Sequence, residues 1–291
     1  MRSSNPRPPE AKPPWRPTPL IRGSVVLHAG AIGLALVRPH LWPWALSAVV
    51  ADHLFITAAG LTPRSALLGP NWTRLPARPD AMPAVAITID DGPDAEVTPR
   101  VLDLLDEHHA QATFFCIGAR IVRHGAIARD IVRRGHEIGN HSYRHLKRFS
   151  LLGPRAIADE VMRAQLAIAA AAGETARFFR APAGFRNPFL EPVLAHAGLE
   201  LVSWTRRGFD TVNDSPDGVL GRLTRDLAAR DILLLHDGNA ARTRAGAPII
   251  LEVLPRLLVA LKAAGLTCVT LSHALPGARA VRAVGSAGAP V

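Results

Sequence analysis

Residues 88–93, Thr-Ile-Asp-Asp-Gly-Pro, place two adjacent carboxylates at the end of an apolar run that begins at Ala84. The run is short and contains β-branched residues, which is typical of a buried strand, and Gly92-Pro93 ends it. Two neighbouring carboxylates repel each other unless a cation or a hydrogen-bond donor lies between them. The same six residues are also good turn chemistry, so alone they are compatible with a solvated turn.

Strand-like apolar runs alternate with helical patterns from this stretch to near the end of the chain. Between most of the runs, apolar residues recur at the spacing of an amphipathic helix. The repeated strand–helix pattern predicts an α/β fold with a parallel sheet, and seven such units favour a deformed, about seven-stranded (β/α) barrel. The expected strands cover residues 84–89, 112–117, 136–139, 178–181, 199–204, 231–236 and 267–271.

Composition limits the class of partner. The chain has 291 residues, 48% of them hydrophobic, and a net charge of +10. That is enough for one large core plus an appendage. The arginines that supply most of the positive charge are scattered and not interleaved with aromatics, so we expect no nucleic-acid partner. Cys116 and Cys268 both lie in apolar runs, which favours two free thiols over a disulfide.

The chain divides into five parts by composition. Proline and arginine dominate the first part, which we expect to be disordered. The expected parts are a disordered N-terminus (1–22), a transmembrane hairpin (23–61), a linker (62–83), the strand–helix domain (84–275) and a flexible tail (276–291).

The apolar stretches within residues 23–61 have three interpretations: a cleaved signal peptide, a soluble helical hairpin and a membrane hairpin. Asp52 would be costly inside a bilayer, whereas Trp42 and Trp44 suit an interfacial turn, and we favour the membrane hairpin. Basic residues flank the pair on both outer sides, and only Arg38 lies in the turn. The positive-inside rule then places both ends, and the following domain, on the cytoplasmic side of a bacterial inner membrane.

Polar residues follow the expected strands at their carboxyl ends, where a parallel barrel builds its active site. Two of them, His141 and His145, are four residues apart and are close enough to share a metal ion, with Asp91 as the natural third ligand. A polar loop with incidental histidines is the competing interpretation of this pair. The polar residues at strand ends are Asp90, Asp91, His141, His145, Arg180, Asp210 and His236.

Four motifs make a family resemblance specific. They are Thr-Ile-Asp-Asp-Gly-Pro at 88–93, His-Ser-x-x-His at 141–145, Arg-Ala-Pro-Ala-Gly at 180–184 and Leu-Leu-Leu-His-Asp at 233–237. In this order they resemble the polysaccharide deacetylase family, also called the NodB-homology or carbohydrate esterase 4 family, over about residues 84–272. The resemblance implies a deformed (β/α) barrel and a metal-dependent hydrolase that removes N- or O-acetyl groups from sugars.

The resemblance also implies roles for individual residues. Asp91, His141 and His145 are expected to bind a divalent metal, Zn²⁺ first, with Co²⁺, Ni²⁺ or Mn²⁺ as alternatives. The other implied roles are a catalytic base (Asp90), a catalytic acid (His236), a residue that orients the base (Arg180) and one that tunes the acid (Asp210). The backbone N–H of Ala183 is expected to bind the oxyanion.

Departures from the family pattern bear on the substrate. Ala183 and Thr211 stand where the family usually has aromatic residues, so a long polymer fits less well, although Trp204 could substitute in part. Leu233 and Leu235 are candidates for the wall around the acetyl methyl, or are ordinary core. With the membrane hairpin, this favours a lipid-linked saccharide or glycolipid.

Two alternatives remain at this level. A C–N hydrolase acting on a non-sugar amide would keep the same polar residues. A non-catalytic carbohydrate- or lipid-binding protein would need no acid, base and metal together. The sequence leaves the oligomeric state open.

Overall fold

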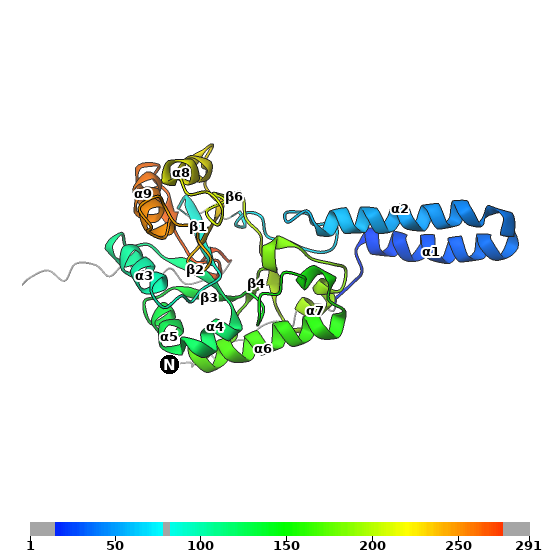
Figure 1. Cartoon of the computed structure of the whole chain (residues 1–291), viewed down its shortest axis with the longest axis horizontal. Helices are drawn as coiled ribbons and strands as arrows, with labels where there is room; N and C mark the ends of the chain where they lie inside the picture. The colour runs from blue at the N-terminus through cyan, green and yellow to red at the C-terminus, as the bar shows by residue number, and fades with distance from the viewer. Residues whose placement is uncertain (1–14, 78–81, 276–291) are drawn as a thin grey trace, which may run out of the picture.

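The computed structural model describes residues 15–77 and 82–275. The expected disorder of residues 1–14 and of the tail 276–291 therefore lies outside the described residues. Figure 1 shows an α/β domain from which a pair of long helices projects.

The domain is built on one parallel sheet. The strand order is β5-β4-β3-β2-β1-β7-β6, and β8 pairs with β1. Within the described residues no ladder joins β5 to β6, so the sheet is an open half-barrel, which confirms the expected deformed barrel. The strands are β1 (Ala84–Asp90), β2 (Ala112–Cys116), β3 (Glu137–Asn140), β4 (Phe178–Phe179), β5 (Glu200–Leu201), β6 (Arg206–Arg207), β7 (Ile232–His236) and β8 (Thr267–Cys268).

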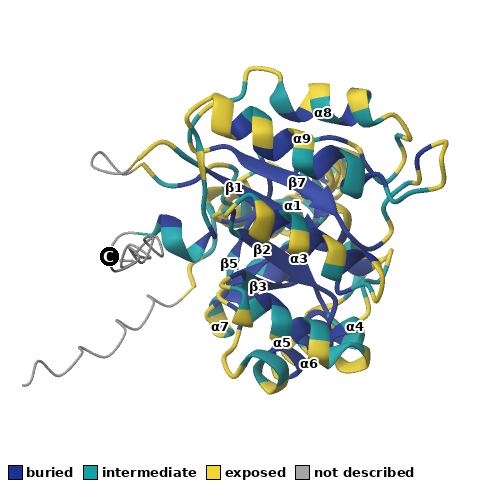
Figure 2. Ribbon diagram, turned by 90° about the vertical axis from the view of Figure 1, so that its left-hand side faces the viewer, coloured by how far each residue is buried: buried dark blue, intermediate teal, exposed yellow. Residues whose placement is uncertain are grey.

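Helices cover the outer face of this sheet. Figure 2 shows the strands as a buried centre, with the exposed residues of the helices directed outward. Each helix buries one apolar face on the strands, and this packing explains the amphipathic pattern in the sequence. The helices of the domain are α3 (Val97–Glu107), α4 (Gly118–Arg123), α5 (Gly125–Arg133), α6 (Pro154–Ala172), α7 (Leu190–His196), α8 (Pro216–Thr224) and α9 (Ile250–Ala263).

The core has two layers because side chains alternate along each strand. The larger cluster lies between the sheet and the helices and includes Leu233 and Leu235 of β7. The smaller cluster lies on the concave face and includes Leu234, with Phe115 and Trp204. Both cysteines are free, as expected.

The stretch expected to be a linker packs against the open side of the half-barrel. The N–H of Trp72 donates to the carbonyl of Leu201 at 2.9 Å, and the N–H of Leu75 donates to the carbonyl of Arg230 at 2.9 Å. Residues 72–75 thus span the gap between the β5 and β7 sides of the sheet. Leu75 is 2% exposed and belongs to the smaller core cluster.

The projecting pair consists of α1 (Pro19–Val37) and α2 (Trp42–Gly60), joined by a 3₁₀ turn (Pro39–Leu41). Both helices are long and apolar enough to cross a membrane. The polar residues face each other between the helices: Ser24 Oγ donates to Asp52 Oδ2 at 2.6 Å, and Nε2 atoms of His28 and His53 lie 3.1 Å apart. Asp52, which the sequence marked as costly in a bilayer, therefore has a partner. The first helix begins four residues earlier than the expected hairpin.

Candidate active site

The strand register brings the tips of β1 and β7 together. Asp90 is the last residue of β1, and its register partner on β7 is His236. Asp91 follows at φ 75°, in the left-handed region that aspartate tolerates better than most residues. A Cβ at Gly92 would lie 2.5 Å from the carboxylate of Asp237, so the turn that ends β1 requires glycine.

A tight loop after β3 carries the two histidines. Asn140 Oδ1 accepts the Ser142 N–H at 2.9 Å, and Ser142 Oγ accepts the His145 N–H at 3.1 Å. Ser142 and His145 have positive φ, at 62° and 52°. The spacing of four residues between His141 and His145 thus brings the pair together through side-chain-stabilised turns and not through a helix.

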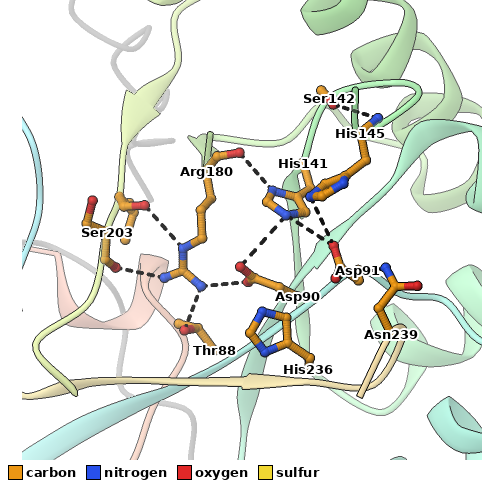
Figure 3. Close-up of polar contacts among 12 residues, drawn as sticks. Thr88, Asp90, Asp91, His141, Ser142, His145, Arg180, Ser203, His236 and Asn239 are labelled. Atoms are coloured by element: carbon orange, nitrogen blue, oxygen red, sulfur yellow. Dashed lines mark hydrogen bonds and ion pairs between the residues drawn. The ribbon is translucent and has the colours of Figure 1, made fainter. Parts of the chain in front are cut away.

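Asp91, His141 and His145 converge on one point (Figure 3). Asp91 Oδ1 lies 3.4 Å from His141 Nε2 and 3.3 Å from His145 Nε2, and this buried oxygen accepts no hydrogen bond from a described residue. His141 Nδ1 lies 2.8 Å from the Arg180 carbonyl, so the neutral ring donates from Nδ1 and directs the Nε2 lone pair toward Asp91. An orphaned buried carboxylate oxygen between two imidazole nitrogens is a donor set that could hold a divalent cation.

The charges of this group suit a cation. Burial alone would raise the pKa of Asp91, but His141 and His145 outweigh it and lower the pKa below its ordinary value. Burial and the neighbouring His141 lower the pKa of His145, which favours the neutral imidazole that a metal requires. Asp91 is therefore anionic and His145 neutral near pH 7. Burial lowers the pKa of His141, but Asp90 and Asp91 outweigh burial and raise it, so a cation bound here would displace the second proton of that ring.

Asn239 is a residue of the site that the sequence analysis missed. Its Nδ2 donates to Asp91 Oδ2 at 3.0 Å, which directs the other oxygen, Oδ1, toward the histidines. Asn239 comes three residues after His236, so its place just beyond the last motif was the available signal.

Asp90 is held by a buried arginine. Arg180 Nη1 donates to Asp90 Oδ1 at 2.6 Å and to Thr88 Oγ1 at 2.8 Å. Its other nitrogens donate to the carbonyls of Val202 at 3.2 Å and Ser203 at 2.8 Å. Arg180 is 1% exposed, so its charge needs these acceptors. Asp90 Oδ2 points toward the group of Asp91, His141 and His145, 3.8 Å from His141 Nε2.

His236 is fixed by Asp210 at two points. Its Nδ1 lies 2.9 Å from Asp210 Oδ1, and its backbone N–H donates to Asp210 Oδ2 at 2.7 Å. Burial lowers the pKa of His236, but Asp210 outweighs burial and raises the pKa from 6.5 to about 9. His236 is therefore protonated at neutral pH and has Nε2 free to donate a proton.

A pocket of about 190 Å³ joins these groups. Of the substrate-binding candidates, Ala183 and Trp204 line it, whereas Leu233 and Leu235 lie in the core against the helices. The expectation that these two leucines could form the pocket wall was wrong by one position. Side chains alternate along β7, so Leu234 faces the pocket and its two neighbours face the helices. The lining residues are Asp90, Asp91, His141, His145, Ala183, Gly184, Trp204, Arg207, Thr211, Leu234 and His236.

The base of the helical pair adjoins the pocket wall. A Cβ at Gly184 would lie 2.7 Å from the Trp204 ring and 2.8 Å from Pro63, three residues after α2. Ser203 Oγ donates to the Pro63 carbonyl at 2.5 Å, and the Arg186 N–H donates to the Gly60 carbonyl at 3.0 Å. The end of α2 and the pocket therefore share one packed loop region.

Known proteins are similar to this chain in sequence and in fold. The sequence profile of the family described as polysaccharide deacetylase matches residues 77–202. A peptidoglycan-N-acetylglucosamine deacetylase from Bacillus cereus is 34% identical over 193 residues, which cover 66% of this chain and 87% of that protein. A chitooligosaccharide deacetylase from Sinorhizobium fredii is 37% identical and aligns over 54% of this chain and 73% of its own.

A solved structure with the same fold is a carbohydrate esterase 4 family pseudoenzyme from Bacillus anthracis. It is 26% identical with a TM-score of 0.61, and the match covers 70% of this chain and 68% of that chain. Proteins with this fold therefore include both enzymes and a pseudoenzyme. The residues of the pocket, and not the fold, distinguish an enzyme from a pseudoenzyme.

Proposed function

Because this chain belongs to the polysaccharide deacetylase family, we propose that it is a metal-dependent hydrolase that removes an acetyl group from a saccharide. One observation carries the proposal: three kinds of group meet at one pocket. They are the candidate metal ligands around Asp91, a carboxylate that Arg180 binds, and a histidine that Asp210 binds. Hydrolysis of an amide needs a base, an acid and stabilisation of the oxyanion, and this pocket offers candidates for all three.

Asp91, His141 and His145 would hold the metal, with Zn²⁺ as our first choice and Co²⁺, Ni²⁺ or Mn²⁺ as alternatives. A divalent cation there supplies Lewis-acid chemistry, which lowers the pKa of water and polarises a carbonyl oxygen. Asp90 is not a member of this group of converging ligand atoms, and its Oδ2, which Arg180 does not bind, is left to accept a proton.

Asp90 acts as the general base in our proposal. Its Oδ2 accepts a proton from the attacking water, while Arg180 keeps the carboxylate oriented and its charge balanced. His236 acts as the general acid and gives its Nε2 proton to the leaving amine, while Asp210 keeps the opposite side of the ring protonated. The backbone N–H of Ala183 is our candidate oxyanion donor.

We propose a saccharide attached to a lipid as the substrate. The relatives are named for peptidoglycan N-acetylglucosamine and for chitooligosaccharides, so an N-acetylated sugar is the reacting unit. Ala183 and Thr211 line the pocket without the flat surface that an aromatic ring offers a long polymer. Since the pocket wall adjoins the end of α2, a membrane-inserted hairpin would hold the pocket near the lipid surface.

The hairpin would anchor the protein in a bacterial inner membrane, with the deacetylase domain on the cytoplasmic side. Each helix of 19 residues is about 28 Å long at 1.5 Å per residue, close to the thickness of a bilayer core. Trp42 and Trp44 are exposed at the far turn, where an interfacial belt would bind them.

A non-catalytic binding protein is the second candidate function, because a relative of the same fold is a pseudoenzyme. A binding protein needs no base, acid and ligand set in one pocket, and their joint presence favours the enzyme. A screen of metal-loaded, detergent-purified protein for released acetate tests both. Acetate from N-acetylated sugars is the expected result. Acetate from non-sugar amides only would indicate a different C–N hydrolase, and sugar binding without acetate would indicate the binding protein.

A further inference from the structure

Arg207 of β6 is a cation in the pocket wall that the proposed reaction does not use. It lines the same pocket as Asp90, His236 and Trp204. Its side chain forms no hydrogen bond or ion pair with another described residue, and its buried Nε lacks an acceptor. Buried donors nearly always have an acceptor in folded proteins, so this arrangement calls for one.

The nearby carboxylates do not supply that acceptor. Both oxygens of Asp210 accept from His236, and Asp90 Oδ1 accepts from Arg180. Each carboxylate is therefore matched by a cation of its own. A divalent metal bound at Asp91 would carry more positive charge than Asp91 balances, so the metal-loaded pocket would have an excess of positive charge near Arg207.

Aromatic contacts hold Arg207 in place without using its N–H groups. The guanidinium carbon lies 4.4 Å from the centroid of the Phe209 ring and 5.3 Å from that of Trp204. Stacking uses the flat face of a guanidinium and leaves its N–H donors, which lie in the plane, free to form a fork. A fork of this kind matches the oxygens of a phosphate or a carboxylate.

We propose that Arg207 binds an oxyanion carried by the saccharide itself, so that the substrate is an anionic acetylated sugar. This inference rests on the proposed deacetylase function and names the substrate class for it. In an N-acetylglucosamine unit the acetamido group is on C2, so groups on C1 and C3 are its immediate neighbours. A phosphate ester at C1 and a carboxylate on a C3 ether are the two sources of the oxyanion.

Three soluble sugars separate these sources in assays of metal-loaded, full-length protein. They are methyl N-acetylglucosaminide, which is neutral, N-acetylglucosamine 1-phosphate and N-acetylmuramic acid. We expect kcat/KM for one anionic sugar to exceed that for the neutral sugar, by roughly tenfold to a hundredfold for a charge-assisted pair. Arg207→Gln should bring this ratio close to one, and Arg207→Lys should keep part of it.

Arg222→Gln is the matched control. Arg222 also stacks on Phe209, at 5.3 Å, but it is exposed on α8 and does not line the pocket. It should leave the ratio unchanged. Calorimetric titration with the same three sugars gives a second readout that needs no turnover, in which Arg207→Gln should weaken binding of the anionic sugar selectively.

The outcomes distinguish this inference from the proposed function. Equal kcat/KM for all three sugars in the parent protein would overturn the inference and leave the deacetylase intact. An equal loss on neutral and anionic sugars in Arg207→Gln would also overturn it, because that is the effect of disturbed packing. If no sugar releases acetate, the proposed function fails, and selective binding of an anionic sugar in the titration still decides the role of Arg207.

Discussion

His236 Nδ1 lies 2.9 Å from Asp210 Oδ1, and the backbone N–H of the same histidine donates to the second oxygen of Asp210 at 2.7 Å. One carboxylate thus fixes both the position and the charge of the histidine. These residues are 26 apart in the chain and come from the loop after β6 and the end of β7. In the proposed reaction, this contact makes His236 an acid.

Asp210→Asn should move the alkaline limit of activity to lower pH. Asp210 raises the pKa of His236 to about 9, and a general acid stops working as the pH rises through its pKa. Without the carboxylate the pKa falls toward 6.5, so the loss of kcat/KM should begin at lower pH. A pH profile of kcat/KM for both proteins measures this shift. An unchanged alkaline limb would assign the acid role to another residue.

His141→Ala and His145→Ala should each remove bound metal and activity together. Both side chains face Asp91 Oδ1 from a loop at the sheet edge, so the core should survive and the thermal unfolding temperature should change little. Metal analysis after dialysis, with circular dichroism, gives both quantities. His196→Ala, at an exposed position on α7, is the control and should keep its metal. Full metal content in both site variants would show that the ligands lie elsewhere.

Asp90→Asn should keep the metal but lose turnover. An amide is similar in shape to the carboxylate but cannot accept a proton, so kcat should fall by roughly 10²–10⁴-fold. Parallel metal analysis separates this variant from the histidine variants. Activity within a few-fold of the parent would mean that Asp90 is not the base.

Arg180→Met should destabilise the domain as well as inactivate it. Asp90 would remain buried without the guanidinium that lies 2.6 Å from it, and breaking a buried ion pair costs about 3–5 kcal/mol of unfolding free energy. Urea unfolding measures the loss. The double variant Arg180→Met with Asp90→Asn removes the uncompensated charge and should recover part of it. No recovery would show that the carbonyl contacts of Arg180 matter more than the ion pair.

Removal of the helical hairpin should leave activity intact only if the truncated chain keeps residues 62–77. A chain that starts at Leu61 keeps residues 62–77 and should hydrolyse a soluble acetylated sugar without membranes. A chain that starts at Met82 loses Leu75, which is 2% exposed, and Trp72, which packs against the same core cluster. Its unfolding free energy should fall by on the order of 3 kcal/mol or more.

Sedimentation of the full-length protein with membranes tests the membrane role of the hairpin. A soluble full-length protein and an insoluble shorter chain would indicate a hairpin that covers the domain instead.

The sequence was sufficient where one local pattern decides one local structure. The apolar run before Asp90 predicts β1, and the motifs at strand ends predict which polar residues meet. It was insufficient where distant packing decides. Residues 72–75 were expected in a linker, but they lie across the open side of the half-barrel because the concave face needs cover. Strand β6 has two residues, both arginine, and shows no alternation that could reveal it.

Two other features of the pocket could not be predicted from the sequence: which leucine of β7 faces the pocket, and the role of Arg207. Leu233 and Leu235 differ from Leu234 only in which face of β7 they occupy, and the register with β1 sets that face. Arg207 resembles any other arginine of a basic chain until its neighbours are known. The rings of Trp204 and Phe209 and the absence of an acceptor among the described residues make it distinctive.

The central claim is that Asp91, His141 and His145 hold a metal on which deacetylation depends. Acetate release from an N-acetylated chitooligosaccharide should be measured on detergent-purified, full-length protein after removal of metal by a chelator and again after titration with Zn²⁺. We predict loss of acetate release in the stripped protein and its return as Zn²⁺ approaches one equivalent. Acetate release that continues at the same rate in the metal-free protein would contradict the account.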